Sequence, residues 1–571
     1  MSFRIRLTKG KDKDAVKLTF FDRVTSIAVR MFSRVSSNLS SSIPTLRDNI
    51  LKSNLRITPE GLISDALLFT VVSGIVAVLG IWVGFVMYHI PYFLALIAVV
   101  PLVFTLIING PKISSSSRAS AIDTELPFVV GYISVLAGGG VSPLATLRRI
   151  SELKLFPAAA KEAKRILVEV DVFGQDPITA IETVARWNPN RRFSEFLYGY
   201  TAVLKGGGNF LVYVQGKLRD IMETKASQVK RSADTTGTMA EAYLTVTVIL
   251  GMVLYTLYMV QTLISHNLGG LYNLYFFSFI IVPLISVAFL WLIDAVQPKW
   301  PYVDYRPYRY FIYTAPVAAI IFLLPLGLHL YLRTALSLIA LASAPAVVAW
   351  GSSRERRALE RSLPEFIRDV AEGRKTGLSP EIAIERLGDR HYGSLSKHVK
   401  KMGAQLSWGV ELSKVVSTFT SAVASWITRA IGVLLIEVVD VGGGTIRSFS
   451  DMAEFTRSIN EMEGERRAAL RPFVYITYVA GIMVIITTFI MVYLLTAPAL
   501  SGIGTSSVPT VDPTTIDMLL TTAVFDAFVI GIVAGKMGES GIPDGFKHGI
   551  FLVIASLVAI YIARLFISIP V

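Results

Sequence analysis

The chain has 571 residues, of which 53% are hydrophobic and only 17% charged, whereas soluble proteins have about 25% charged residues. This composition excludes an ordinary soluble protein and indicates an integral membrane protein. The net charge of +13 therefore raises the question of membrane sidedness, and we expect no nucleic-acid partner. With no cysteine and six scattered histidines that lack ligand spacing, we expect no metal and no other cofactor.

Residues 1–61 predict a basic cytoplasmic segment, with twelve Lys and Arg against five Asp and Glu and no apolar run that would suit a cleaved signal. Apolar residues recur here at helical spacing, with arginines between them. A basic amphipathic helix of this kind suits either an anionic leaflet or another part of the same protein, and both interpretations stay open. The residues are Phe20, Val24, Ile27, Ala28, Met31 and Val35, with Arg23, Arg30 and Arg34.

Nine apolar stretches are each close to the roughly 20 residues that cross a bilayer. They lie at 62–88, 91–109, 242–264, 272–293, 311–328, 332–350, 472–495, 515–535 and 549–568. We therefore predict an all-α polytopic fold with a transmembrane pair (62–110), four transmembrane helices (241–350) and three more (472–571). Two polar modules, 111–240 and 351–471, separate these groups.

The first polar module reads as short helices. They are expected after Asp123, from Pro143, near 158–170, after Asp176 and over 193–204, and a long helix through 220–230 then leads to the membrane. The triple glycines 206–208 and 442–444 lie between helical stretches, so we interpret them as helix breaks.

We interpret the two polar modules as copies of one unit, because short motifs recur at a slowly drifting offset. The clearest is a helix-turn-helix corner, in which glycine ends one helix, serine caps the next and proline takes its first position. Its residues are Gly140, Ser142 and Pro143 in the first copy, and Gly377, Ser379 and Pro380 in the second. Leu126-Pro127 likewise matches Leu363-Pro364, and 242–245 matches 474–477.

The basic residues predict the topology. If the nine spans alternate, 53 of the 55 Lys and Arg residues fall on one face, and the loop 497–517 has none. By the positive-inside rule, both modules face the cytoplasm, the loop faces out and the C-terminus lies outside the cell membrane.

Motifs for catalysis are missing from the sequence, so we expect no enzyme. No Gly-Lys pair is followed by the Ser or Thr of a phosphate-binding loop, and there is no Gly-x-Ser-x-Gly or His-Glu-x-x-His. Asp526 is the one acid well inside a predicted span. Two interpretations of Asp526 stay open. It could serve a secondary transporter or channel, or it could simply form a hydrogen bond within the helix bundle.

These features together resemble the platform proteins of archaeal type IV pilus-like machines, including the archaellum, which carry two type II secretion F domains. The two corners resemble the Gly-[Leu/Val]-Ser/Thr-Pro turn of that domain, and the run 51–60 resembles the start of the family's first span. Near the C-terminus, the residues that resemble the family's glycine-rich cytoplasmic turn are Gly531, Gly535, Lys536, Gly538, Gly545, Lys547 and His548.

The resemblance implies a non-catalytic platform that couples a separate cytoplasmic ATPase to the insertion or rotation of pilin- or archaellin-like subunits. Membrane lipid and a second copy of the chain are further candidate partners. Basic clusters at module corners are candidate ATPase contacts, although each is by default a solvated surface charge. They are Arg148, Arg149, Arg191, Arg192, Arg386, Lys400 and Lys401. The sequence does not distinguish an archaellum from an adhesive or other pilus.

Overall fold

A computed structural model describes residues 20–55, 57–88, 96–265, 269–297, 304–325, 327–440, 445–496, 513–539 and 541–566. Regular secondary structure in these residues is helical throughout, which confirms the predicted all-α fold class. The second triple glycine, 442–444, and residues 497–512 of the predicted outer loop lie outside the described residues. The chain divides into two compact units, and each is described by itself.

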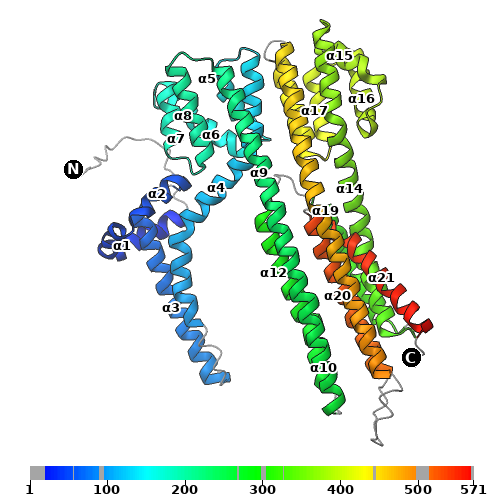
Figure 1. The fold of residues 1–571 in the computed structure, drawn as a ribbon. Helices are drawn as coiled ribbons and strands as arrows, with labels where there is room; N and C mark the ends of the chain where they lie inside the picture. Colours follow the sequence, from blue (N-terminus) through cyan, green and yellow to red (C-terminus); the bar gives the residue numbers. More distant parts are fainter. Residues whose placement is uncertain are drawn as a thin grey trace, which may run out of the picture. The chain divides into compact units, whose positions relative to one another are not determined.

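The first unit comprises residues 1–129 and 144–213. Its helices are α1 (Phe20–Ser42), α2 (Pro44–Ser53), α3 (Pro59–Tyr88), most of α4 (Val99–Gly138), α5 (Pro143–Glu152), α6 (Pro157–Asp171), α7 (Pro177–Arg186) and α8 (Arg191–Lys205) (Figure 1). Local sequence signals determine where these helices begin and end. Asp176 caps α7 by accepting from the N–H groups of Ile178 and Thr179, and the left-handed Gly207 follows the end of α8.

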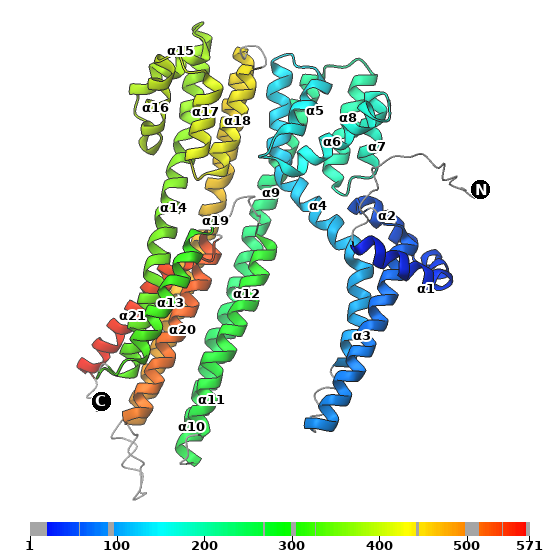
Figure 2. The same ribbon diagram turned by 180° about the vertical axis from the view of Figure 1, so that it is seen from behind.

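The second unit comprises residues 130–143 and 214–571. Its helices are α9 (Phe210–Leu244), α10 (Gly251–Ser265), α11 (Gly269–Phe276), α12 (Val282–Val296), α13 (Arg306–Leu323), α14 (Leu330–Lys375), α15 (Pro380–Arg386), α16 (Ser396–Ser407), α17 (Leu412–Ala422), α18 (Trp426–Asp440), α19 (Ile446–Thr496), α20 (Pro513–Glu539) and α21 (Gly545–Phe566) (Figure 2). A π-helical stretch, Thr245–Leu250, joins α9 to α10 without a break.

Helix α20 forms the core of the second unit. Of its most apolar window, 78% is buried, against 28–39% in the other membrane-spanning candidates of this unit. It packs against α12, α14, α19 and α21, and its Leu519, Val524 and Phe528 belong to the main hydrophobic cluster. Because so much of α20 is in contact with protein, movement of any neighbouring helix must be accommodated by it.

Long helices pass directly from the polar modules into the apolar spans. Helix α14 has 46 residues and α19 has 51, and the boundaries predicted at residues 350 and 471 fall inside them. In the first copy, α4 likewise runs through residue 110. The separate helix predicted after Asp123 was therefore wrong, because that segment continues α4.

Eight helices in the described ranges are long and apolar enough to cross a membrane. They match eight of the nine predicted spans and support a polytopic membrane protein. The exception is 311–328, which corresponds to α13. That helix starts earlier, at Arg306, and ends at Leu323, so its 18 residues include Arg306 and Arg309 and it does not join the eight.

Helix α13 nevertheless runs antiparallel along the first half of α14. The Thr314 hydroxyl donates to the Leu341 carbonyl at 2.7 Å, and the Ser337 hydroxyl donates to the Ala318 carbonyl at 2.8 Å. If the first half of α14 crosses the bilayer, α13 lies at the same depth beside it. Nine crossings therefore stay our prediction.

Candidate functional site

The glycine-rich C-terminal motif forms a close helix crossing, in which the backbones of α20 and α21 approach each other. A Cβ atom at Gly531 would lie 2.5 Å from the Cα of Gly549, and one at Gly535 would overlap the Cα of Gly545. Two small-xxx-small faces thus meet, as in closely packed transmembrane helices. Gly538 faces α19 in the same way, since a Cβ there would overlap the side chain of Val474.

Charged residues of the same motif lie at the end of this hairpin and contact three other helices. Lys536, whose side chain is 6% exposed, donates to Asp294 of α12 at 2.6 Å. Glu539 pairs with Lys547 and, at 3.3 Å, with Arg357 of α14. The hydroxyl of Tyr478 on α19 is hydrogen-bonded to Nδ1 of His548. The turn between α20 and α21 is therefore linked to α12, α14 and α19.

A cavity of about 420 Å³, which we call the junction cleft, opens beside this turn at the base of the second polar module. Its walls come from α12, the start of α13, α14, α18, α19 and the α20–α21 turn. The polar side chains that line it are Asp294, Gln297, Asp304, Tyr308, Ser352, Ser353, Arg356, Glu360, Glu463, Arg466, Arg467, Lys536, Glu539 and Asp544.

Within the cleft, Glu360 connects the two long helices of the second module. It accepts from Arg467 of α19 at 2.8 Å and from the hydroxyl of Ser425, the residue before α18, at 2.9 Å. In the first copy, Asp123 stands at the same position, four residues before the Leu-Pro proline. It accepts from Asn190, the residue before α8, at 3.5 Å. In both modules, an acid on the first long helix thus accepts a hydrogen bond from the residue that precedes a later helix of the bundle.

Asp544 carries the most perturbed carboxyl of the turn. Burial raises the pKa of Asp544 to about 6, and the nearby carboxylate of Glu539 adds to the shift, while the 2.8 Å hydrogen bond from Ser353 opposes it. Ser353 of α14 therefore contacts the carboxyl of the turn whose pKa burial raises.

The two predicted corners fold as helix-turn-helix corners. Gly140 and Gly377 have φ angles of +80° and +86°, a conformation that favours glycine. In the second copy, the Leu378 N–H donates to the Gly373 carbonyl, and the Ser379 hydroxyl accepts from the Ile382 N–H at 3.3 Å. Pro143 and Pro380 begin α5 and α15.

The predicted ATPase contacts are divided between the two modules, four in the first and three in the second. Arg386, Lys400 and Lys401 are exposed on α15 and α16. Arg148 pairs with Asp171 at 2.7 Å, and the largely exposed Arg191 pairs with Glu195. Arg149 and Arg192 are half-buried, and Arg192 contacts Asp123 at 3.0 Å.

An exposed aromatic side chain occupies the same place in both modules, and sequence reasoning missed it. Phe173 is 67% exposed and Trp408 is 86% exposed. Each is followed directly by a left-handed glycine, Gly174 or Gly409. Three residues after each aromatic residue lies the acid that precedes the next helix, Asp176 before α7 and Glu411 before α17. The constant offset of 235 residues is the signal that could have found the pair.

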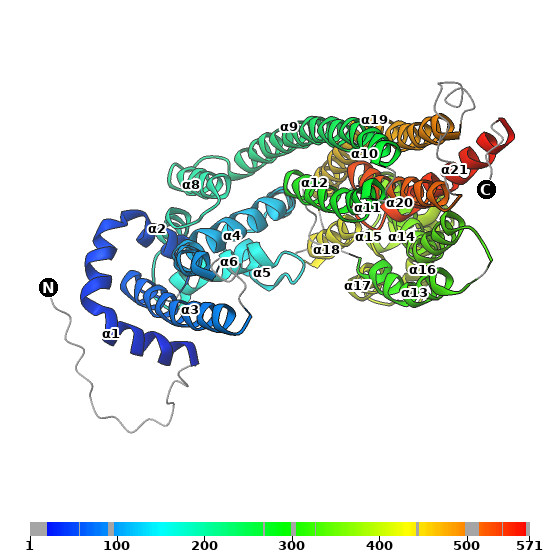
Figure 3. The same cartoon turned by 90° about the horizontal axis from the view of Figure 1, so that it is seen from below.

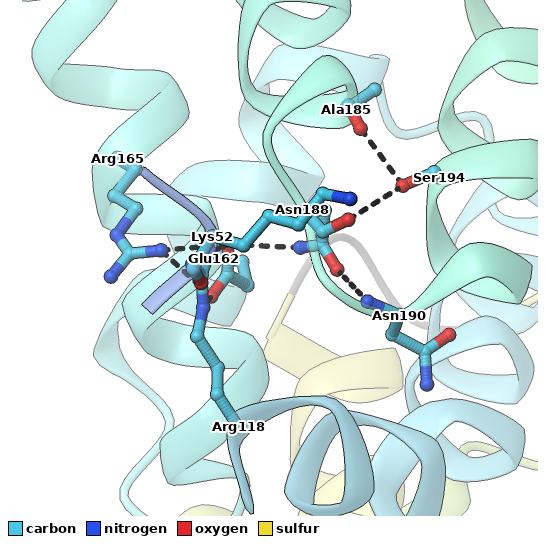
Figure 4. Close-up of polar contacts among 8 residues, drawn as sticks. All are labelled: Lys52, Arg118, Glu162, Arg165, Ala185, Asn188, Asn190 and Ser194. Atoms are coloured by element: carbon cyan, nitrogen blue, oxygen red, sulfur yellow. Dashed lines mark hydrogen bonds and ion pairs between the residues drawn. The ribbon is translucent and has the colours of Figure 1, made fainter. Parts of the chain in front are cut away.

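A buried ion-pair network joins α6 of the first module to α4 and to the end of α2 (Figure 4). Glu162 of α6 is 1% exposed, and Arg118 of α4 donates to it at 2.9 and 2.6 Å. Arg165 and the side-chain amide of Asn188 also donate to Glu162. Arg118 reaches the carbonyl of Lys52, at the end of α2, at 2.6 Å. Burial raises the pKa of the Glu162 carboxyl, and the charge of Arg118 opposes that rise.

Asp526 is buried inside the second unit and is hydrogen-bonded there. Its Oδ2 accepts from the Tyr255 hydroxyl at 2.9 Å and from the Ser278 hydroxyl at 3.1 Å. The adjoining cavity, which Thr247 and Thr488 also line, measures about 10 Å³, room for about one water molecule. This geometry favours the structural interpretation of Asp526 over a substrate path.

The sequence singled out Lys536, Lys547, His548 and the glycines of the hairpin, and the structure brings them together. It also adds partners that sequence reasoning missed. Glu539, Asp544 and Gly549 lie within or beside the motif, and Gly549 repeats the four-residue spacing of Gly531 and Gly535. Asp294 and Arg357 are about 240 and 180 residues away in the chain and carry no local signal.

Comparison with known proteins matches both copies of the duplicated unit. The family model of type II secretion system protein F matches residues 130–258 and again residues 366–493. The chain is 23% identical over 497 residues to an uncharacterized protein of Methanocaldococcus jannaschii, which covers 79% of this chain and 82% of that relative. It is 20% identical over 436 residues to Flagella accessory protein J of the same organism, covering 71% and 76%. No solved structure matches the chain.

Proposed function

Because the chain carries two type II secretion system protein F domains, we propose that it is the membrane platform of a type IV pilus-like or archaellum assembly machine. In this proposal it has no catalytic activity of its own. A separate cytoplasmic ATPase supplies the energy, and the platform converts the conformational change of that ATPase into insertion or rotation of pilin- or archaellin-like subunits.

The structural observation that supports this coupling is the continuity of the long helices. At 1.5 Å per residue, the 51 residues of α19 extend for about 75 Å, enough to cross a bilayer and a cytoplasmic module. Helices α14 and α19 both continue through internal prolines, among them Pro472 of α19, so a tilt or rotation at one end would be passed on to the other, whereas a flexible linker would absorb it. Both helices line the junction cleft, and so does the α20–α21 turn. Motion of the second module would therefore reach the α20–α21 hairpin at this cleft.

The topology of the proposal follows from the basic residues. Both modules would lie on the cytoplasmic side, where the ATPase is, and the C-terminus outside. The filament base would be held by the apolar faces of the spans. The alternative of a transporter that uses Asp526 requires a solute flux, so proteoliposome flux that is lost on Asp526→Asn while filaments still form would favour it.

Deletion of the gene tests the proposed function directly. We expect loss of a surface filament, seen as lost swimming for an archaellum or as lost surface attachment for an adhesive pilus. Re-expression of the full chain should restore the filament. If swimming, attachment and surface filaments all survive deletion, the platform proposal fails.

The exposed aromatics with their basic surroundings are the proposed ATPase contact. Trp408 lies at the end of α16, which also carries Lys400 and Lys401, and exposed aromatic side chains flanked by charge are typical anchors of protein interfaces. We expect Trp408→Ala to weaken binding of the purified platform to the ATPase by about 2 kcal/mol, roughly 30-fold in Kd. Titration by surface plasmon resonance with the platform in nanodiscs measures this change.

Two controls separate a specific contact from general damage. Trp350→Ala removes another exposed tryptophan, on the apolar half of α14, and should leave ATPase binding unchanged. Charge reversal of Lys400 and Lys401 to Glu should weaken binding more than the same reversal at Lys9 and Lys11. Equal effects within either comparison would remove the basis for this contact.

A further inference from the structure

Helix α1 lies across the beginning of the first membrane span and is fixed there by polar contacts. The Thr25 hydroxyl donates to Asp65 at 2.8 Å, and the Ser40 hydroxyl donates to Glu60 at 3.3 Å. Along α1 these two contacts are about 22 Å apart, whereas Glu60 and Asp65 are only about 8 Å apart along α3. The helix must therefore cross α3 obliquely, near the end where the span begins, as Figures 1 and 3 show.

The surface of α1 is divided into sectors that follow one another around its axis, at 100° per residue. One sector packs within the first unit, where Ala28 and Ser36 are fully buried. The next sector carries Ile27, Met31 and Val35, which succeed one another at four-residue spacing and are each more than half exposed.

Beyond the apolar sector the surface becomes basic and then neutral polar. Arg30 and Arg34 are exposed directly beside the apolar stripe, and Ser26, Ser33 and Ser37 are exposed beyond them. A helix in the plane of a membrane surface needs this order: apolar side chains towards the acyl chains, cations at the phosphates and hydroxyls towards water.

We propose that α1 binds the anionic lipid surface of the leaflet through Ile27, Met31 and Val35, with Arg30 and Arg34 on the lipid phosphates. Two observations select lipid as the occupant. The helix is attached to the first turns of a membrane span, so its exposed apolar stripe lies where that span enters the bilayer. The arginines beside the stripe are complementary to anionic headgroups, and residues 1–61 as a whole carry twelve basic against five acidic residues.

The absence of cysteine from the chain allows a direct test. Met31→Cys and Ser33→Cys each place one spin label on the full chain, on opposite sides of α1 at exposed positions. In vesicles of phosphatidylcholine with phosphatidylglycerol, we expect the label at 31 to collide with oxygen and to be sheltered from a water-soluble nickel chelate. The label at 33 should show the reverse.

Removal of the arginine charge should release the helix. In the Met31→Cys background, Arg30→Gln with Arg34→Gln should shift the balance between bound and released α1 roughly 30-fold, seen as a rise in nickel accessibility. Lys161→Gln with Lys164→Gln removes the same charge from exposed positions of α6 and should leave the label unchanged.

Three results would overturn the proposal. In the first, the label at 31 is as accessible to nickel as the label at 33. In the second, it is immobilised and shielded from both oxygen and nickel, which means that protein covers the stripe. In the third, its accessibility is the same in vesicles of phosphatidylcholine alone, so that anionic headgroups play no part.

Discussion

Gly535→Ala is expected to force α20 away from α21 and to abolish filament assembly. The added Cβ would overlap the Cα and N atoms of Gly545, and backbone atoms cannot rotate away as the end of a side chain can. Overpacking of a tight core costs about 1–3 kcal/mol even where side chains can adjust. We therefore expect Gly535→Ala to lower the free energy of unfolding by about 3 kcal/mol or more. Thermal unfolding of the purified protein, together with filament assembly in complemented deletion cells, measures both consequences.

Two other helical glycines give matched controls for this substitution. Gly351 in α14 and Gly464 in α19 have no heavy atom within 4 Å of an added Cβ. Since alanine is favoured over glycine within a helix by about 1 kcal/mol, Gly351→Ala and Gly464→Ala should keep or raise stability. Filaments should then form normally. If Gly535→Ala behaves like these two, close approach of the hairpin is not needed for function.

The features that sequence could predict are those that depend on local spacing. Apolar runs about 20 residues long identified the spans, and glycine, serine and proline in a fixed order identified the corners at Gly140 and Gly377. The same reasoning misplaced α13, which begins at Arg306 and not at residue 311, because the apolar run did not register the local start signals, the Asp304 side chain that accepts from the Arg306 N–H and Pro307 in the first turn. It also failed after Asp123, where no local signal separates a new helix from the continuation of α4.

The junction cleft could be predicted only in part, because its charges meet across long stretches of chain. Lys536 stood out as a cation beside a glycine motif, but its partner Asp294 is 242 residues away. Pairing of this kind depends on which helices pack together, and an acid near the end of a span has many candidate partners. Phe173 and Trp408 were missed for a different reason. Aromatic residues make up 11% of the chain, so composition does not single these two out, and it is their exposure that sets them apart from the other described aromatics of the two modules.

Glu162→Ala is expected to destabilise the first unit by about 3–5 kcal/mol, because it removes one partner of a buried ion pair and leaves the other uncompensated. Arg118, only 15% exposed, would keep just the carbonyl of Lys52, and Asn188 would lose its acceptor. Since this network holds α6 against α4 and the end of α2, limited proteolysis should cleave the α5–α8 segment earlier than in the unchanged protein.

The double variant Glu162→Ala with Arg118→Leu decides whether the buried charge is the cause. Replacing both partners of a buried pair by apolar groups is often close to neutral, so the double variant should recover most of the stability lost by Glu162→Ala alone. Glu195→Ala, which breaks the exposed pair with Arg191, should leave the midpoint of thermal unfolding unchanged. A double variant no more stable than Glu162→Ala would show that Glu162 acts through its contacts with Asn188 and Arg165, and not through Arg118.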